Sequence, residues 1–156
     1  MANQAAGHPV TAAVLLTNPS DNLLIVRPAK ENAPWQLPGG IVEMNESPFD
    51  AVRREGREEL GLDLDVQEYD LFAVEWLQAT RPGRRNRLAF IFAGPVLYPA
   101  DTDRIVLQRD ELDAWRWATR ADAESMLHPA LAARIVGPLQ TPQRAHYRET
   151  RYEGTL

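Results

Sequence analysis

The sequence has 156 residues, about the length of one domain, and 44% of them are hydrophobic, which is enough for a substantial core. Charged residues make up 25%, which excludes a disordered chain, and no apolar run approaches ~18 residues, which excludes a transmembrane helix. The N-terminus lacks the basic-then-apolar order of a secretory signal. We therefore expect a single domain over residues 1–156 that is cytoplasmic and has no membrane partner.

The chain contains no cysteine, which excludes disulfides, thiolate zinc sites and cysteine nucleophiles. Its 17 basic and 22 acidic residues give a net charge of −5, the wrong sign for a domain that holds long nucleic acid by its phosphates. A small anionic substrate stays open, provided that a cation or local arginines offset the acidity.

The first third of the chain predicts a hairpin followed by a glycine turn. Its segments are predicted to be two strands, a loop, a short strand and a tight turn, in this order: Val10–Leu16, Leu23–Val26, 28–34, Trp35–Leu37 and Pro38–Gly40. At the two glycines of the turn, the backbone can approach a ligand closely.

Residues Pro48–Leu60 give the clearest helix prediction. Ser47 is suited to the N-cap, a proline fits the first helical position, and Gly61 ends the helix. We therefore place one well-delimited helix directly after the glycine turn.

The remaining elements alternate strands and helices. The expected strands are Leu64–Tyr69, Leu71–Leu77, Leu88–Phe92, Ile105–Leu107 and Ala114–Ala118, the expected helices are Ala121–Leu127 and Pro129–Val136, and a polar, loosely ordered tail covers about 141–156. This order favours an α+β fold with a mixed sheet flanked by helices.

Three acids of the predicted helix, Glu55, Glu58 and Glu59, share one arc of roughly 100°, next to the apolar face. Glu55 and Glu59 form a like-charge pair at i,i+4, which is unfavourable in a helix selected only for stability. A hard divalent cation such as Mg²⁺ or Mn²⁺ prefers oxygen ligands of this kind. The alternative is a solvated charged helix face.

The segment 40–62 resembles the Nudix box, G-x5-E-x7-R-E-U-x-E-E-x-G-U with U aliphatic, the signature of the Nudix hydrolases (MutT-like proteins). The matching residues are Gly40, Glu46, Arg54, Glu55, Glu58, Glu59, Gly61 and Leu62. Gly56 departs from the pattern because an aliphatic residue usually stands there. We expect this glycine to lose core contact and so to affect stability more than metal binding.

The resemblance implies an α/β/α sandwich and a pyrophosphatase. In this reading, water attacks a phosphorus atom of a nucleoside diphosphate linked to another moiety, such as a nucleoside triphosphate, ADP-ribose or a nucleotide sugar. Magnesium or manganese would be bound by Glu55, Glu58 and Glu59 with a backbone carbonyl of Gly39 or Gly40.

The resemblance also implies roles for individual residues. Glu58 and Glu59 are the first choice as ligands, whereas Glu55 is either a third ligand or the base, and Glu55, Glu58 and Arg54 form the expected catalytic group. Arg54 would orient a carboxylate by a charge-assisted hydrogen bond, and Glu46 would support the turn or reach the metal through water.

Four residues outside the box are further candidates. Glu111 in a late loop is a possible base, and Arg27, Trp35 and Arg87 are candidates for substrate binding. Each has a plain alternative: an exposed loop acid for Glu111, a surface strand end for Arg27, a core residue for Trp35 and a solvated hairpin tip for Arg87.

A second hypothesis from the resemblance is a catalytically silent Nudix-like sensor that binds a nucleotide without cleaving it. The intact acids of the box favour the enzyme over the sensor. A small nucleotide-type substrate is the expected partner, and a homodimer is an open alternative because family members are often dimers.

Overall fold

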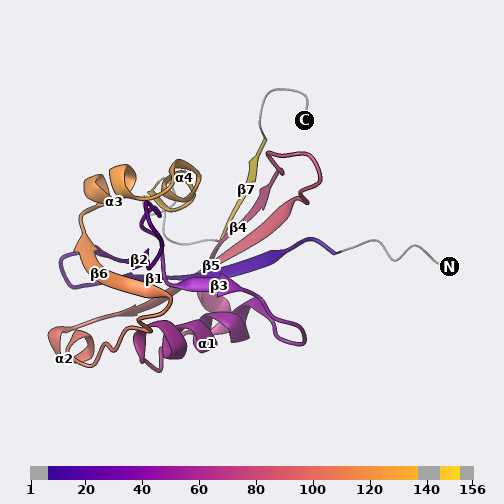
Figure 1. The fold of residues 1–156 in the computed structure, drawn as a ribbon. Coiled ribbons are helices and arrows are strands. Elements are labelled where there is room, and N and C mark those ends of the chain that lie inside the picture. The colour runs from indigo at the N-terminus through magenta and orange to yellow at the C-terminus, as the bar shows by residue number, and fades with distance from the viewer. Residues whose placement is uncertain (1–6, 137–144, 152–156) are drawn as a thin grey trace.

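The computed structural model describes residues 7–136 and 145–151. Within these residues, seven strands form one mixed sheet, and helices cover both of its faces (Figure 1). The strands are β1 (Val10–Thr17), β2 (Leu23–Pro28), β3 (Gly39–Ile41), β4 (Leu71–Leu77), β5 (Arg87–Val96), β6 (Leu112–Ala118) and β7 (His146–Thr150). The helices are α1 (Pro48–Leu60), α2 (Pro99–Thr102), α3 (Arg120–Met126) and α4 (Pro129–Val136), with a short 3₁₀ turn at Glu68–Asp70.

Strand β1 lies at the centre of the sheet, whose order is β6-β2-β1-β5-β4-β7. One edge of β1 pairs with β5 in parallel along its length. The other edge is shared: β3 pairs antiparallel with the first half, where Thr11 lies opposite Ile41, and β2 pairs with the end, where Thr17 lies opposite Leu23. This division places the glycine segment beside the middle of the sheet.

Two separate hydrophobic cores follow from the alternation of side chains along the strands. On β1, Val14 and Leu16 pack on the α1 side of the sheet, whereas Leu15 packs on the side of α3 and α4. The predicted α+β architecture, a mixed sheet between helices, is therefore confirmed. No helix of the described residues is long and apolar enough to cross a membrane.

Two predicted strands are absent from the described structure. Residues Leu64–Tyr69 and Ile105–Leu107 run as loops, the first of them ending in the 3₁₀ turn. Leu64 and Val66 are buried in the core on the α1 side, and Ile105 and Leu107 pack against that core. Their alternating pattern therefore comes from packing against this core and not from pairing in a sheet.

Two further segments differ from the prediction. The expected turn Pro38–Gly40 is instead largely strand β3, and Trp35–Leu37 contributes only isolated bridges, Val26–Gln36 and Trp35–Leu127. Within the expected loose tail, β7 pairs in parallel with β4. The rest of that tail, 141–144 and 152–156, lies outside the described residues.

Candidate active site

Helix α1 carries the acidic residues and is fixed at both ends by its own sequence. The Ser47 hydroxyl accepts a hydrogen bond from the Asp50 backbone N–H, the Asp50 side chain accepts one from Ser47, and Gly61 closes the helix with a φ of 68°. These hydrogen bonds from Ser47 lower the pKa of Asp50. The bounds match the predicted Pro48–Leu60.

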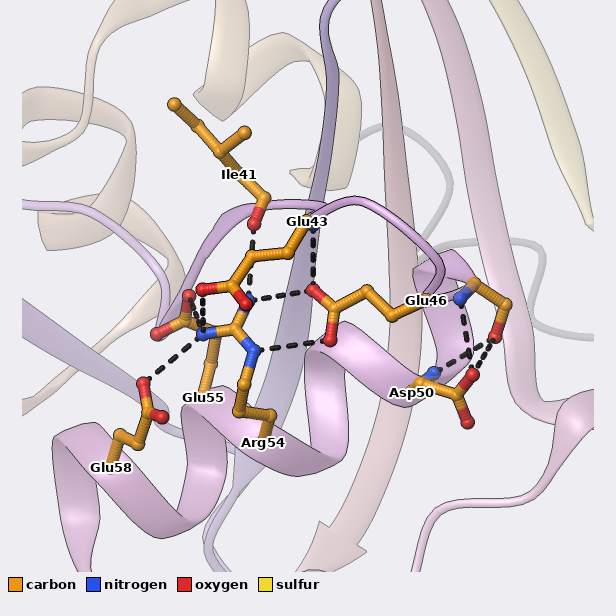
Figure 2. A network of polar contacts seen from close by, with 8 residues as sticks. Ile41, Glu43, Glu46, Asp50, Arg54, Glu55 and Glu58 are labelled. Atoms are coloured by element: carbon orange, nitrogen blue, oxygen red, sulfur yellow. Dashed lines mark hydrogen bonds and ion pairs between the residues drawn. The ribbon is translucent and has the colours of Figure 1, made fainter.

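Arg54 is the centre of the acidic cluster (Figure 2). Its guanidinium donates to both carboxylate oxygens of Glu46 at 3.1 and 2.8 Å, to Glu55 at 2.9 Å and to Glu58 at 3.1 Å. It also donates to the Ile41 carbonyl of β3 at 3.1 Å. The pKa of Glu46 is lowered chiefly by the hydrogen bond from Arg54. Arg54 therefore connects α1, β3 and the loop between them.

Glu59 is the most deeply buried acid of the cluster. Its residue is only 3% exposed, and its carboxylate accepts a hydrogen bond from the Gly39 backbone N–H at 2.8 Å. Burial raises its pKa to about 8, and the charges of Glu55 and Glu111 act in the same direction. A buried carboxylate of this kind is stabilised by a nearby cation.

Glu55 is also buried and lies against the glycine segment. A Cβ atom at Gly40 would overlap a carboxylate oxygen of Glu55, and one at Gly39 would overlap the backbone of Ala12. Gly39 is therefore needed for β3 to pair with β1, whereas a side chain at Gly40 would displace the Glu55 carboxylate. Burial raises the pKa of Glu55, and Arg54 opposes that shift. Glu58, in contrast, faces solvent with half of its side chain exposed.

The late loop brings Glu111 to the same acids. Backbone N–H groups of Val106 and Gln108 donate to the last carbonyls of α1, at Leu60 and Glu59, over 2.9 and 3.2 Å. The charge of Glu111 raises the pKa of Glu55 and of Glu59, so its carboxylate is close enough to act on both. Its role as a base stays a prediction.

Arg27 and Trp35 lie together beside this loop. The Arg27 guanidinium is 5.4 Å from the Trp35 ring centroid and forms an ion pair with Asp113 at 2.6 Å. Arg27, Lys30 and Asp113 line a hollow of about 430 Å³, and the Ala29 N–H donates to the Glu111 carbonyl at 2.7 Å. Sequence reasoning missed Lys30 and Asp113, because only the β2–β6 pairing brings Asp113 beside Arg27.

Arg87 lies apart from these groups. It begins β5 and pairs with Leu77 next to the loop that connects β4 and β5, where its side chain is exposed. No contact among the described residues connects it to the acids. Its role in substrate binding stays a prediction.

The donor types suit a hard divalent cation: the carboxylates of Glu55 and Glu59 lie against the glycine segment, and Glu58 stands on the same helix. Among the described residues, no group of three acids or histidines is arranged so that it could hold a metal ion. Glu55 and Glu58 instead accept hydrogen bonds from Arg54. Carboxylate side chains must therefore turn to bind an ion. The chemistry of the carboxylate oxygens fits such an ion.

Comparison with known sequences gives a family match over most of the chain. The family model described as the NUDIX domain matches residues 7–136. A "MutT-like protein" of Streptomyces ambofaciens is 39% identical over 61 residues, which cover 39% of each chain. An "RNA pyrophosphohydrolase" of Halorhodospira halophila is 35% identical over 115 residues, covering 67% of this chain and 62% of the relative. The chain thus spans less than two thirds of these relatives' lengths.

Solved structures share the fold. A "UDP-X diphosphatase" structure superposes with a TM-score of 0.71 at 18% identity and covers 94% of this chain and 69% of that one. An Ap4A hydrolase of C. elegans gives 0.68 at 16% identity, with 85% and 95% covered. A MutT protein of Methanosarcina mazei gives 0.65 at 19% identity, with 87% and 94% covered.

Proposed function

This chain belongs to the Nudix family, and from that membership we propose that it is a pyrophosphohydrolase that cleaves a nucleoside diphosphate linked to another moiety. The observation that carries the proposal is the convergence of Glu55 and Glu59 beside the glycine segment, with Arg54 holding the neighbouring carboxylates of Glu46 and Glu58. The relatives named RNA pyrophosphohydrolase support the reaction class.

Magnesium or manganese is the proposed cofactor, held by Glu55, Glu58 and Glu59 with a carbonyl of Gly39 or Gly40. When bound, the ion supplies positive charge that neutralises the diphosphate oxygens and makes water a better nucleophile. Arg54 would keep Glu46 and the helix acids in place through its charge-assisted hydrogen bonds. Glu59 stays anchored to the backbone of Gly39.

Two carboxylates are suited to removing a proton from the attacking water. Glu111 is the first, because it comes from a separate loop and can stay clear of the ligand set. Glu55 is the second, since its burial raises its pKa and so makes it a stronger base than an exposed carboxylate. Either group would act at its carboxylate oxygen.

The hollow beside Glu111 is the proposed place for the organic part of the substrate. Arg27 and Lys30 line it together with the acids Glu31 and Asp113, and the Trp35 ring lies next to it, beneath the Arg27 guanidinium. These groups suit a base and a phosphate or ribose at the far side of the cleaved bond. The candidate substrates are nucleoside triphosphates, ADP-ribose, nucleotide sugars and, from the named relatives, the 5′ end of RNA.

The test is the release of phosphate, pyrophosphate or nucleoside monophosphate from a panel of these compounds with Mg²⁺ or Mn²⁺. Wild type is compared with Glu59→Gln, and Glu124→Gln on exposed α3 serves as the matched control. Turnover by wild type and the control but not by Glu59→Gln is the expected result. If no compound is hydrolysed and one still raises the melting temperature, the protein is a nucleotide sensor and not an enzyme.

A further inference from the structure

Positive charge is concentrated at one corner of this acidic protein. No Asp or Glu occurs between Glu75 and Asp101, although the chain has 22 acids and a net charge of −5. The same stretch contains four arginines, all exposed at the end of the β4–β5 hairpin: Arg81, Arg84, Arg85 and Arg87. We call these four residues the hairpin arginines.

The hairpin arginines have no carboxylate partner among the described residues. None of them occurs in an ion pair there, in contrast to Arg54 and Arg57, which both do. Arg85 donates only to the Gly7 carbonyl, which is uncharged and leaves the positive charge uncompensated. Four like charges at one end of a hairpin favour an anion with several charged groups over a single phosphate.

A fifth arginine and an aromatic ring lie at the same corner. Leu77 lies opposite both Arg87 and Thr150, so Arg151, which follows Thr150, lies near the hairpin arginines; β7 and the hairpin project together from the sheet (Figure 1). The Arg151 guanidinium is 5.0 Å from the Trp76 ring centroid and pairs with Glu149 at 2.7 Å. The Trp76 ring and the planar guanidinium of Arg151 are both groups on which nucleobases can stack.

The register of the sheet connects this corner to the acids. Thr11 of β1 lies opposite Ala89 on one side and Ile41 on the other. Since adjacent strands are about 4.8 Å apart, Ala89 and Ile41 are about 10 Å apart across β1. The Ile41 carbonyl accepts a hydrogen bond from Arg54, and Arg87 precedes Ala89 by two residues on β5. The basic corner therefore lies at the same end of β1 as the loop between β3 and α1, on the opposite side of β1 from β3.

We propose that the hairpin arginines bind the phosphodiester backbone of a single-stranded RNA whose 5′-phosphorylated end lies at the acids of α1. The inference rests on the proposed function and specifies its substrate class. Whole-chain charge predicts against long nucleic acid, but the arginines present a local charge of the right sign to the few nucleotides that follow the cleaved end. Binding of this kind is independent of base sequence and falls as salt rises.

The first experiment measures binding, which needs no turnover. An RNA of about ten nucleotides with a 5′ monophosphate and a 3′ fluorophore is titrated with protein at several salt concentrations. Replacing two arginines, Arg84→Ala with Arg85→Ala, is expected to weaken binding roughly tenfold at low salt and to lower the salt slope by about 1.4. Arg104→Ala removes an exposed arginine that follows α2 and pairs with Asp101, and this variant should bind like wild type.

Equal binding by the double variant and Arg104→Ala would overturn the proposal. Displacement of the probe by polyglutamate as readily as by unlabelled RNA would also overturn it, because the corner would then suit an acidic protein partner.

The second experiment separates this inference from the proposed function. The ratio of kcat/KM for a 5′-triphosphorylated RNA to kcat/KM for a nucleoside triphosphate is compared between wild type and the double variant. A lower ratio supports the RNA surface. An unchanged ratio with full mononucleotide turnover would contradict the RNA-binding surface and would retain the proposed hydrolase activity. RNA binding that depends on the arginines, without any turnover, would support the RNA-binding surface and contradict the proposed hydrolase activity.

Discussion

Arg54 binds two oxygens of Glu46, one of Glu55, one of Glu58 and the Ile41 carbonyl with a single planar group. Lysine keeps the charge but lacks the fork of donors. Arg54→Lys should lower the free energy of unfolding by about 1–3 kcal/mol and reduce kcat about 10–100-fold, as measured by urea unfolding and product release. Arg57→Lys, on the exposed face of α1, is the control. Equal stability of the two variants would contradict this role.

Glu59 gives the metal-free protein a pH-dependent stability. Its folded pKa of about 8 is above the ordinary value of 4.5, so the folded state binds its proton more tightly than the unfolded state does. This contribution is fully present below about pH 4.5 and is lost as the pH rises to about 8. In EDTA, the melting temperature of wild type should therefore fall more than that of Glu59→Gln as the pH rises from about 5.5 to about 8.5, because Glu59 loses its proton in the folded state over this range. Parallel losses in the two proteins would refute this assignment.

The acids were predictable from the sequence, because helical spacing alone puts Glu55, Glu58 and Glu59 on one arc. The helical spacing did not distinguish their environments: the sheet buries Glu55 and Glu59 and leaves Glu58 in solvent. Asp113 and Lys30 carried no local signal. They join Arg27 only through strand pairing and a loop, which spacing along the chain does not encode.

Gly56 of α1 is explained by its neighbour. A Cβ atom there would lie 2.7 Å from a terminal carbon of Leu64, so Leu64 fills the space that an aliphatic residue would occupy. Core contact is therefore not lost, in contrast to the expectation from the sequence. Gly56→Leu should lower the free energy of unfolding by about 1–3 kcal/mol despite better helix propensity. Urea unfolding measures the change.

The matched test of this packing is a double-mutant cycle. Leu64→Ala alone leaves a cavity, whereas Gly56→Leu with Leu64→Ala exchanges the two side chains across the same contact. The double variant should be more stable than the sum of the single changes predicts. Additive losses would show that the two positions do not share the space.

The loop before β6 is positioned by the end of α1. The Val106 N–H donates to the Leu60 carbonyl, and the Val106 side chain is 71% exposed. Val106→Pro removes this donor without removing buried surface, so it should lower both the melting temperature and kcat by displacing Glu111. Val106→Ala keeps the N–H and should resemble wild type. An unchanged kcat in the proline variant would contradict a catalytic role for Glu111.

Elements with local signals were predicted well and the others were not. Helix α1 has its cap, its first-turn proline and its final glycine in the sequence, and α4 matches the predicted Pro129–Val136. Residues 64–69 were wrongly predicted as a strand because burial against a hydrophobic core produces the alternation that a sheet also produces. Strand β7 was missed because this edge strand buries none of its side chains fully and so carries no hydrophobic alternation.

At the scale of the whole molecule, the order of strands and helices predicted a mixed sheet between helices, and the two cores follow from alternation of side chains on its central strands. The sharing of β1 between β2 and β3 was not predictable, since it depends on contacts far apart in the sequence. That sharing brings the glycine segment onto α1. The net charge of −5 did not reveal the basic corner, because a net charge does not show where along the chain the charged residues lie.

The most direct test of the central claim is the metal dependence of hydrolysis in the intact protein. Product release from the best compound of the panel is measured after EDTA treatment, and then after Mn²⁺ is added back, for wild type and Glu59→Gln. We predict no turnover without metal, recovery in wild type, and a rate at least about 100-fold lower in Glu59→Gln. Full turnover in EDTA, or equal recovery in both proteins, would contradict the assignment of these acids.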